Sequence, residues 1–164
     1  MCSDMAELWF LKIDGIQGES TDAHHQGEID VLSWSWGVSQ SQGGGGGGGG
    51  GAGKPAFQDL NALTRISAAS PLLLQACATG KHIATAVLSG VRAGASATTP
   101  FVTYRLSDVT VSTVAHSDGE MDAPAEQFSL SYTKVEVTYR PQTKTGQMGK
   151  AVTFAYDLGK NTKL

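Results

Sequence analysis

The chain has 164 residues, which suffices for one folded domain whose core needs no disulfide or metal. Its formal net charge is only −3, and Lys and Arg are scattered singly, which argues against a nucleic-acid partner. No apolar run approaches the ~20 residues of a membrane-spanning helix, so membrane insertion is not expected, and the low charged fraction of 16% favours a surface that meets other protein.

The N-terminal residues lack the basic and apolar segments of a signal peptide, so no cleaved signal is expected. Only two cysteines are present, Cys2 and Cys77, and their spacing matches neither a disulfide framework nor a metal motif. The sequence therefore predicts a protein made in the reducing cytoplasm, which could leave the cell only by another route.

Most of the chain alternates with the period of β-strands. Residues 7–13 read ELWFLKI, and residues 28–40 read EIDVLSWSWGVSQ. In the second segment we expect one face to carry Leu32, Trp34, Trp36 and Val38, and the other to carry Ile29, Val31, Ser33, Ser35 and Gly37. Further predicted strands, rich in Val, Thr, Tyr and Phe, are 57–66, 84–92, 100–115, 126–140 and 151–158.

The Trp34-Ser35-Trp36 step allows two interpretations. Both indole rings lie in the core, or they form an exposed binding platform. We favour the core for Trp34 and Trp36, and both interpretations place Ser35 on the opposite face.

Residues 41–56 form a long loop that contains nine consecutive glycines, Gly43 to Gly51. Such a run buries no apolar surface and is costly to order. We expect a flexible excursion from a single domain spanning residues 1–164, because too few strands lie on either side for separate cores. Long loops of this kind are usually functional or disordered.

Gly48 to Lys54 satisfies the spacing of a phosphate-binding loop. Pro55 stands where such a loop needs Ser or Thr to hold Mg²⁺, and the match is almost forced by the glycine run. The sequence shows no converging acid, base or nucleophile elsewhere. We therefore predict a protein that is not an enzyme and has no cofactor.

The adjacent His24 and His25 could in principle bind a metal ion. Their segment, STDAHHQGE, reads as a polar loop, and no other ligand stands at a typical spacing. We expect a structural role for these histidines and no metal site.

One helix is predicted at residues 71–79, with Ser70 as its N-cap, Pro71 at its first position and Gly80 just past its end. It is apolar almost all round, so it should be buried, with Leu72, Leu73 and Cys77 among its core contacts. Lys81 and His82 follow at once, where their side chains would suit the last carbonyls of the helix.

Many short strands, one short helix and one long Gly-rich loop predict a mainly β fold. Two packed sheets forming a small barrel or sandwich, with the helix against them, fit this pattern.

Four ordered segments carry a family resemblance, namely EIDVLSWSWGVSQS, FQDLNALTRI, SPLLLQACATGKH and YTKVEVTYRPQ. With the Gly-rich loop after the first of them, they resemble the Hcp family, the haemolysin-coregulated proteins of type VI secretion. The resemblance covers the chain from about Leu8 to Asp157. It implies two sheets closing toward a barrel, in a subunit that forms hexameric rings around a wide lumen.

The resemblance further implies that rings stack into a tube that assembles in the cytoplasm inside a contractile sheath, carries a VgrG-type spike, and is secreted with effector proteins in its lumen. A lumen should be lined by small polar side chains, so we expect Ser33 and Ser35 there. The extended loop is expected to contribute to ring stacking through Gln42, Gly43, Gly47, Gly51 and Lys54. The two rival hypotheses are a nucleotide hydrolase using the Gly-rich loop and a monomeric β-sandwich binding module of the adhesin or lectin kind.

Overall fold

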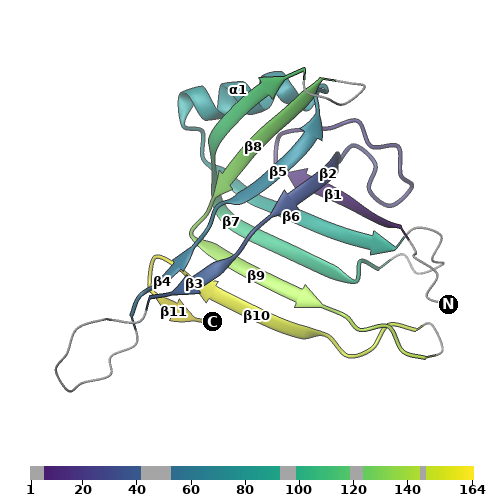
Figure 1. The fold of residues 1–164 in the computed structure, drawn as a ribbon, viewed down its shortest axis with the longest axis vertical. Helices are drawn as coiled ribbons and strands as arrows, with labels where there is room; N and C mark the ends of the chain where they lie inside the picture. The colour runs from purple at the N-terminus through teal and green to yellow at the C-terminus, as the bar shows by residue number, and fades with distance from the viewer. Residues whose placement is uncertain (1–5, 42–52, 93–98, 119–123, 145–146) are drawn as a thin grey trace.

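The structure is a computed structural model, and it describes residues 6–41, 53–92, 99–118, 124–144 and 147–164. Its main element is a nine-stranded antiparallel sheet in the order β11-β10-β9-β7-β6-β1-β2-β5-β8. An additional pairing of β7 with β8 closes six of these strands into a barrel (Figure 1). The predicted mainly β barrel with one helix is confirmed.

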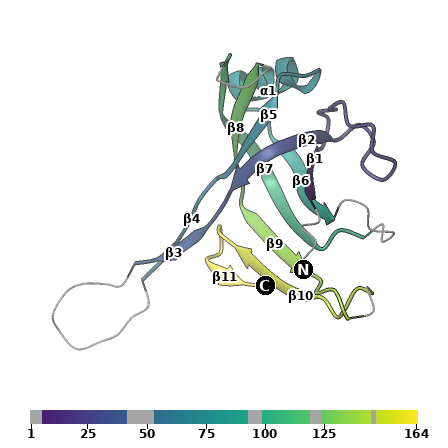
Figure 2. The same cartoon turned by 45° about the vertical axis from the view of Figure 1, so that its right-hand side comes forward.

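The barrel strands lie largely within the predicted strand segments. Their bounds are β1 (Glu7–Ile13), β2 (Ile29–Ser35), β5 (Leu60–Arg65), β6 (Ile83–Arg92), β7 (Val102–Ser117) and β8 (Ala125–Ser131). Beyond the barrel, β9 (Lys134–Tyr139), β10 (Val152–Asp157) and β11 (Thr162–Lys163) extend the sheet from the first half of β7. The short strands β3 (Val38–Gln40) and β4 (Pro55–Phe57) pair only with each other and project from the barrel (Figure 2).

Three predicted strands are each two strands in the structure. Residues 28–40 form β2 and β3, residues 57–66 include parts of β4 and β5, and residues 126–140 form β8 and β9. In the first two cases the chain leaves the barrel to build the projecting hairpin. In the third it turns from the barrel to the sheet extension through Tyr132 and Thr133.

Strand β7 changes partner in its middle. Its residues 102–107 pair with β9, and its residues 110–117 pair with β8. Between them Asp108 adopts a left-handed φ of 54°, which Asp tolerates better than most residues. Its carboxylate accepts a 2.8 Å hydrogen bond from the Thr133 hydroxyl and lies 3.1 Å from His82 Nε2. These two hydrogen bonds lower the pKa of Asp108.

A β-bulge in β2 reverses the expected side-chain alternation. The pairing of β2 with β5 shifts register between Val31 and Ser33. Before the bulge Ile29 and Val31 are buried, and after it Trp34 turns inward while Ser33 and Ser35 are exposed. The prediction that Ile29 and Val31 share a face with the serines is therefore wrong, because an extra residue exchanges the two faces of the strand.

The helix α1 (Ala69–Thr79) begins two residues earlier than predicted. Its N-cap is Ala68, which has no side-chain cap, so the assignment of Ser70 as N-cap is wrong. Ser70 lies inside the first turn, where its hydroxyl accepts a 2.9 Å hydrogen bond from the Ser67 N–H. The Ser67 hydroxyl in turn accepts a 3.2 Å hydrogen bond from the Ala69 N–H. The hydroxyls of both serines therefore accept backbone N–H groups at the start of the helix, in place of a single N-cap side chain.

The end of α1 lies at Gly80 as predicted. This glycine has a left-handed φ of 63° and donates its N–H toward the carbonyls of the last turn. The Lys81 N–H also bonds to the Ala76 carbonyl, at 3.0 Å. Backbone groups thus satisfy the carbonyls for which the side chains of Lys81 and His82 were expected, and the His82 ring pairs with Asp108 instead.

The core fills the barrel and the space under α1. Its largest fully buried side chains include Phe128, Leu11, Leu60, Leu73, Leu88 and Leu106. Trp9 packs so closely over Gly90 that a Cβ there would lie 2.6 Å from the indole ring. Only glycine fits at this position of β6 without displacing the ring.

Candidate functional site

Two rows of side chains on the outward face of four neighbouring barrel strands contain no charged residue. Register places two rows of side chains across β2, β5, β8 and the second half of β7. The first row is Ser35, Asn61, Ser129 and Thr113, and the second is Ser33, Leu63, Gln127 and Ala115. We call these eight residues the polar face. It brings the two predicted lumen residues, Ser33 and Ser35, into one continuous surface with side chains that the sequence analysis did not single out.

Hydrogen bonds join side chains of the polar face to each other and to its neighbours Ser112 and Asp59. The Ser112 hydroxyl, in a bulge of β7, donates to Asp59 Oδ2 at 2.7 Å and lies 3.1 Å from the Ser129 carbonyl. The Ser129 hydroxyl donates to Asn61 Oδ1. Polar groups that already have partners offer little to a passing ligand, so this surface can stay hydrated without strongly retaining protein.

Behind the polar face, Trp34 and Trp36 turn toward the inside of the barrel and join a chain of aromatic rings. The Trp34 ring centroid lies 4.9 Å from that of Trp9 and 4.8 Å from that of Tyr104. Both predicted core tryptophans pack against the hydrophobic core, but each is only half-buried.

The Trp36 indole N–H donates to the Tyr132 hydroxyl, which itself donates to the Gln58 carbonyl at 2.7 Å. Desolvation raises the pKa of Tyr132 to about 12, with the Trp36 hydrogen bond opposing that rise. This chain of two hydrogen bonds ties the end of β2 to the start of β5. It fixes the point from which the β3–β4 hairpin projects.

The predicted buried residues of α1 divide between its two faces. Leu73 is fully buried and Cys77 is half-buried against the core. Leu72 is 39% exposed in the single chain, so the prediction that it is a core residue is wrong. The helix buries only Ala69, Ser70, Leu73 and Ala76, because just one side of it faces the barrel.

Of the predicted stacking loop, the structure describes only the end. Gln42, Gly43, Gly47 and Gly51 lie outside the described residues, as does most of the segment with phosphate-loop spacing. Lys54 is exposed at the start of β4. Strand β3 precedes the loop and β4 follows it, and their pairing holds the two ends of the loop beside each other.

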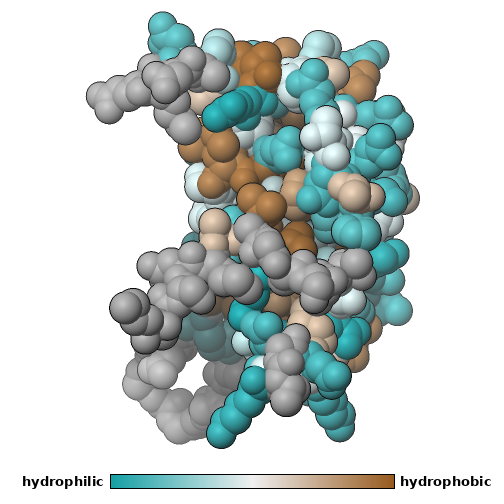
Figure 3. All heavy atoms as spheres, turned by 90° about the vertical axis from the view of Figure 1, so that its right-hand side faces the viewer, coloured by the Kyte–Doolittle hydropathy of each residue, from teal (hydrophilic) through white to brown (hydrophobic). Residues whose placement is uncertain are grey.

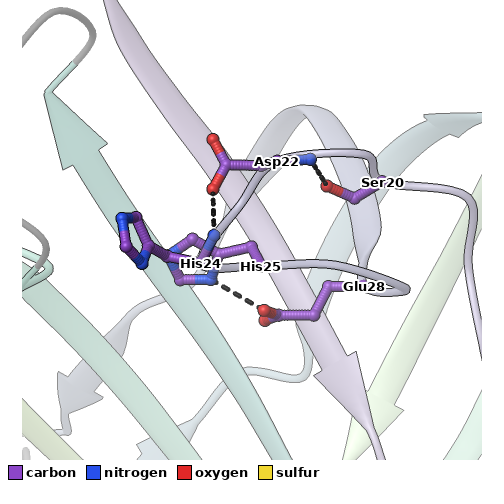
Figure 4. Close-up of polar contacts among 5 residues, drawn as sticks. All are labelled: Ser20, Asp22, His24, His25 and Glu28. Carbon is purple, nitrogen blue, oxygen red and sulfur yellow. Dashed lines mark hydrogen bonds and ion pairs between the residues drawn. The ribbon is translucent and has the colours of Figure 1, made fainter.

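The two adjacent histidines occupy different environments in the loop between β1 and β2 (Figure 4). His25 is buried, its ring stacks on Phe10 at a centroid distance of 4.5 Å, and its Nδ1 lies 2.7 Å from Glu28 Oε2. His24 is exposed. Among the described residues no group of three or more His, Cys, Asp or Glu side chains could hold a metal ion.

The buried carboxylate of Glu126 was not predicted. Glu126 is 1% exposed, and its Oε2 lies 2.6 Å from His116 Nε2 on the neighbouring strand. Thr64 pairs with Glu126 from the other side and has a buried hydroxyl without a partner. Alternation alone could have placed Glu126, His116 and Thr64 on the inner face. That they are neighbours could be known only from the register of β5, β8 and β7.

Large apolar side chains are exposed at several places besides the polar face. They are Leu8, Leu32, Val38, Ile66, Leu72, Leu74, Tyr139, Val152, Phe154 and Leu164. Figure 3 shows one side of the molecule, on which hydrophobic surface runs between hydrophilic side chains. Grouped apolar exposure of this kind is typical of surfaces that another protein covers. Within the described residues, no helix has the length and apolar character needed to cross a membrane.

Comparisons with known proteins agree on one family. Residues 10–139 match the sequence model described as "Type VI secretion system effector, Hcp". The chain is 42% identical to protein hcp1 of Pseudomonas aeruginosa over 161 residues, which cover 97% of this chain and 99% of the relative.

Solved structures show the same likeness. The chain is similar to Hcp1 from Salmonella typhimurium, with 34% identity, a TM-score of 0.80 and coverage of 98% of this chain and 100% of the other. It is also similar to a type VI secretion system effector from Yersinia pestis, with 32% identity, a TM-score of 0.74 and coverage of 91% and 98%.

Proposed function

The chain belongs to the Hcp family of type VI secretion proteins, and we propose that it is the tube subunit, which forms hexameric rings that stack end to end. Proteins of this family are secreted structural proteins and are not known as enzymes. We extend this to the present chain and assign it no catalytic role and no cofactor.

The observation that carries the proposal is the polar face. Neither of its two rows contains a charged residue, and most of its side chains are small. Such a surface suits the wall of a wide, water-filled lumen through which proteins pass. In the proposed ring, Ser33 and Ser35 face this lumen and contact the effector proteins carried there.

Two strand edges beside the polar face support ring closure. Within the described residues, β1 pairs with β2 only over residues 29–31, so one edge of residues 33–35 is free. On the opposite side, residues 110–117 of β7 pair with β8 but not with β6. A free edge favours pairing with another strand.

These two edges differ, so joining them is a heterologous contact that can close into a ring. The four strands of the polar face alternate in direction, because β2, β5, β8 and β7 pair antiparallel in turn. If β7 of one copy lay beside β2 of the next, the antiparallel order would continue from subunit to subunit. The polar face would then form an unbroken inner wall.

The other proposed partners follow from family membership. The tube assembles in the cytoplasm within a contractile sheath, carries a VgrG-type spike at its tip, and is secreted. The loop of residues 41–56 contributes to stacking through Gln42, Gly43, Gly47, Gly51 and Lys54. The β3–β4 hairpin supports this role because its two strands project from the barrel and hold the ends of the loop (Figure 2).

The decisive measurement is the solution mass of the purified chain by light scattering, supported by electron microscopy. We expect a mass six times that of the 17.1 kDa chain and rings with an open centre. A monomer peak that does not depend on concentration at neutral pH would contradict the proposal. It would favour a monomeric binding module instead.

A further inference from the structure

A pocket of about 280 Å³ opens where the loop between β1 and β2 meets the junction of β5 and α1. Leu32 and Ile66 line it and are 38% and 42% exposed. Leu32 is the residue that the bulge of β2 turns away from the core. The pocket therefore presents apolar surface that gains free energy when another protein covers it.

The same pocket carries an excess of negative charge. Glu19 and Asp30 lie in its lining, and Arg65 is the cation among its lining residues. The pKa of Asp30 is raised by burial first and then by the negative charge of Asp22, with a smaller contribution from Glu19. Arg65 opposes this rise without cancelling it, so the pocket favours a positively charged occupant.

Hydrogen bonds brace the loop between β1 and β2, which carries Glu19 to the pocket. Asp22 Oδ1 accepts a 2.9 Å hydrogen bond from the His24 N–H, and the Asp22 N–H donates to the Ser20 hydroxyl at 3.2 Å (Figure 4). The Gly18 N–H bonds to the Gly27 carbonyl at 2.8 Å and closes the base of the loop. Little conformational entropy is then lost when a partner docks.

The turn between β10 and β11 is a basic element suited to this pocket. Lys160 and Lys163 are both exposed there. The Lys160 N–H donates to Asp157 Oδ1 at 3.0 Å, and the Tyr156 hydroxyl donates to Asn161 Oδ1 at 2.7 Å, which together fix the turn. In the described part of the chain every ion pair involves a histidine, so these lysines have no carboxylate partner within the chain.

The pocket and the turn lie at opposite ends of the molecule. In Figures 1 and 2 the loop between β1 and β2 is at the upper right, and β11 is toward the lower left. One chain cannot place its own turn in its own pocket. A contact between two different ends of identical chains is heterologous and can repeat without closing, as stacking requires.

We propose that the acidic pocket of Glu19, Asp30, Leu32 and Ile66 receives the basic β10–β11 turn of a second copy. This inference rests on the proposed tube function and adds an electrostatic contact between successive rings. Exposed charges are screened over about 10 Å at 0.1 M salt and about 3 Å at 1 M, so association should weaken as salt rises.

The test uses charge reversal in the full chain, with sedimentation measuring the end-to-end association of rings. One variant carries Glu19→Lys and Asp30→Lys, and the other carries Lys160→Glu and Lys163→Glu. Each alone should lower the association constant by about tenfold or more, because attraction becomes repulsion. Glu136→Lys, a single charge reversal at an exposed position of β9 outside both surfaces, is the control and should leave association unchanged.

Mixing the two reversed variants gives the sharper result. Each pocket then meets a turn of opposite charge, so the mixture should recover the association that either variant lacks alone. The proposal is overturned if the mixture stays dissociated, if the control weakens association equally, or if wild-type association is insensitive to salt. Light scattering of each sample reports ring formation separately, so the loss of rings would count against the tube function and not against this contact.

Discussion

At the residue scale, polar side chains hold the ends of the barrel strands together. Tyr132 lies in the turn between β8 and β9 and links the Trp36 indole to the Gln58 carbonyl. Its ring is 8% exposed, and desolvation keeps the phenol neutral well beyond its usual range. A buried hydroxyl that accepts one hydrogen bond and donates another holds three chain segments in a specific arrangement.

The first prediction is a loss of stability at high pH. The pKa of Tyr132 is about 12 in the folded chain against 10.0 for an unperturbed phenol. Above pH 10 the unfolded chain loses this proton while the folded chain keeps it, so the free energy of unfolding falls as pH rises toward 12. Urea denaturation between pH 9 and pH 12 should show a steeper decline for the wild type than for Tyr132→Phe. Equal slopes would contradict the buried, neutral phenol.

The second prediction concerns the proposed lumen. Ser35 is exposed on the polar face, so Ser35→Gln should leave the melting temperature and the ring mass unchanged. The longer amide should alter how much effector protein co-purifies with the ring. Ala78→Gln, exposed on α1, serves as the control and should retain effectors like the wild type. If both variants behave alike, the polar face is not the effector-contacting surface.

At the element scale, α1 has apolar residues both on the side that packs against the barrel and on the side exposed to solvent. Its sequence is apolar almost all round, yet only the stripe facing the barrel is buried. The remaining exposed leucines, Leu72 and Leu74, point away from the core. They are available to partners that a single chain does not contain.

The third prediction compares neighbouring leucines in this helix. Leu73→Ala removes a fully buried side chain and should lower the free energy of unfolding by about 2–5 kcal/mol. Leu72→Ala should change it by less than about 0.5 kcal/mol, because that side chain is largely in water. Denaturant titration of both variants under conditions that dissociate any assembly provides the measurement. Equal losses would mean that the helix is rotated from its described position.

The fourth prediction concerns the start of α1. The Ser70 hydroxyl is buried and accepts the Ser67 N–H, so Ser70→Ala leaves that donor unpaired. We expect a loss of about 1 kcal/mol, the size of an ordinary cap, although Ser70 is not the N-cap itself. Thermal unfolding of Ser70→Ala, and of the double variant Ser70→Ala with Ala68→Ser, separates the Ser67 contact from ordinary N-capping. A hydroxyl at position 68 should not restore the loss if the Ser67 contact is what matters.

At the scale of the whole molecule, the closed barrel and the projecting β3–β4 hairpin are two structurally separate parts. The pairing of β7 with β8 closes the barrel, while among the described residues β3 and β4 pair only with each other. A two-stranded ribbon of this length is marginal in water by itself. We therefore propose that its loop serves contacts between copies more than the stability of a single chain.

The fifth prediction follows from that division. Replacing Gly43–Gly51 by a two-residue turn should leave the hexameric ring and its melting temperature unchanged, because loop closure depends only weakly on length. Stacked tubes should be lost, as seen by electron microscopy, while light scattering still reports rings. Dissociation into monomers would place the loop in the ring contact. Tubes of ordinary length would leave stacking to other surfaces, such as the acidic pocket and the basic turn.

The sequence by itself determined the strand positions, the helix end and the family. Alternation identifies strands because side chains on a pleated strand change face at every residue, as in Glu7–Ile13. Gly80 marks the helix end because only glycine adopts its left-handed backbone at no cost. The four quoted segments carried the Hcp resemblance, which the comparisons confirmed.

Only the tertiary structure decided which faces meet which surroundings. The bulge beside Leu32 depends on register against β5, so alternation within β2 could not reveal that its two faces exchange. The exposure of Leu72 depends on which side of α1 meets the barrel, which an all-round apolar helix does not encode. The pairing of Glu126 with His116 and the opposite placement of the acidic pocket and the basic turn are likewise long-range. Such contacts are set by chain segments far apart in sequence, and local patterns carry no information about their distance in space.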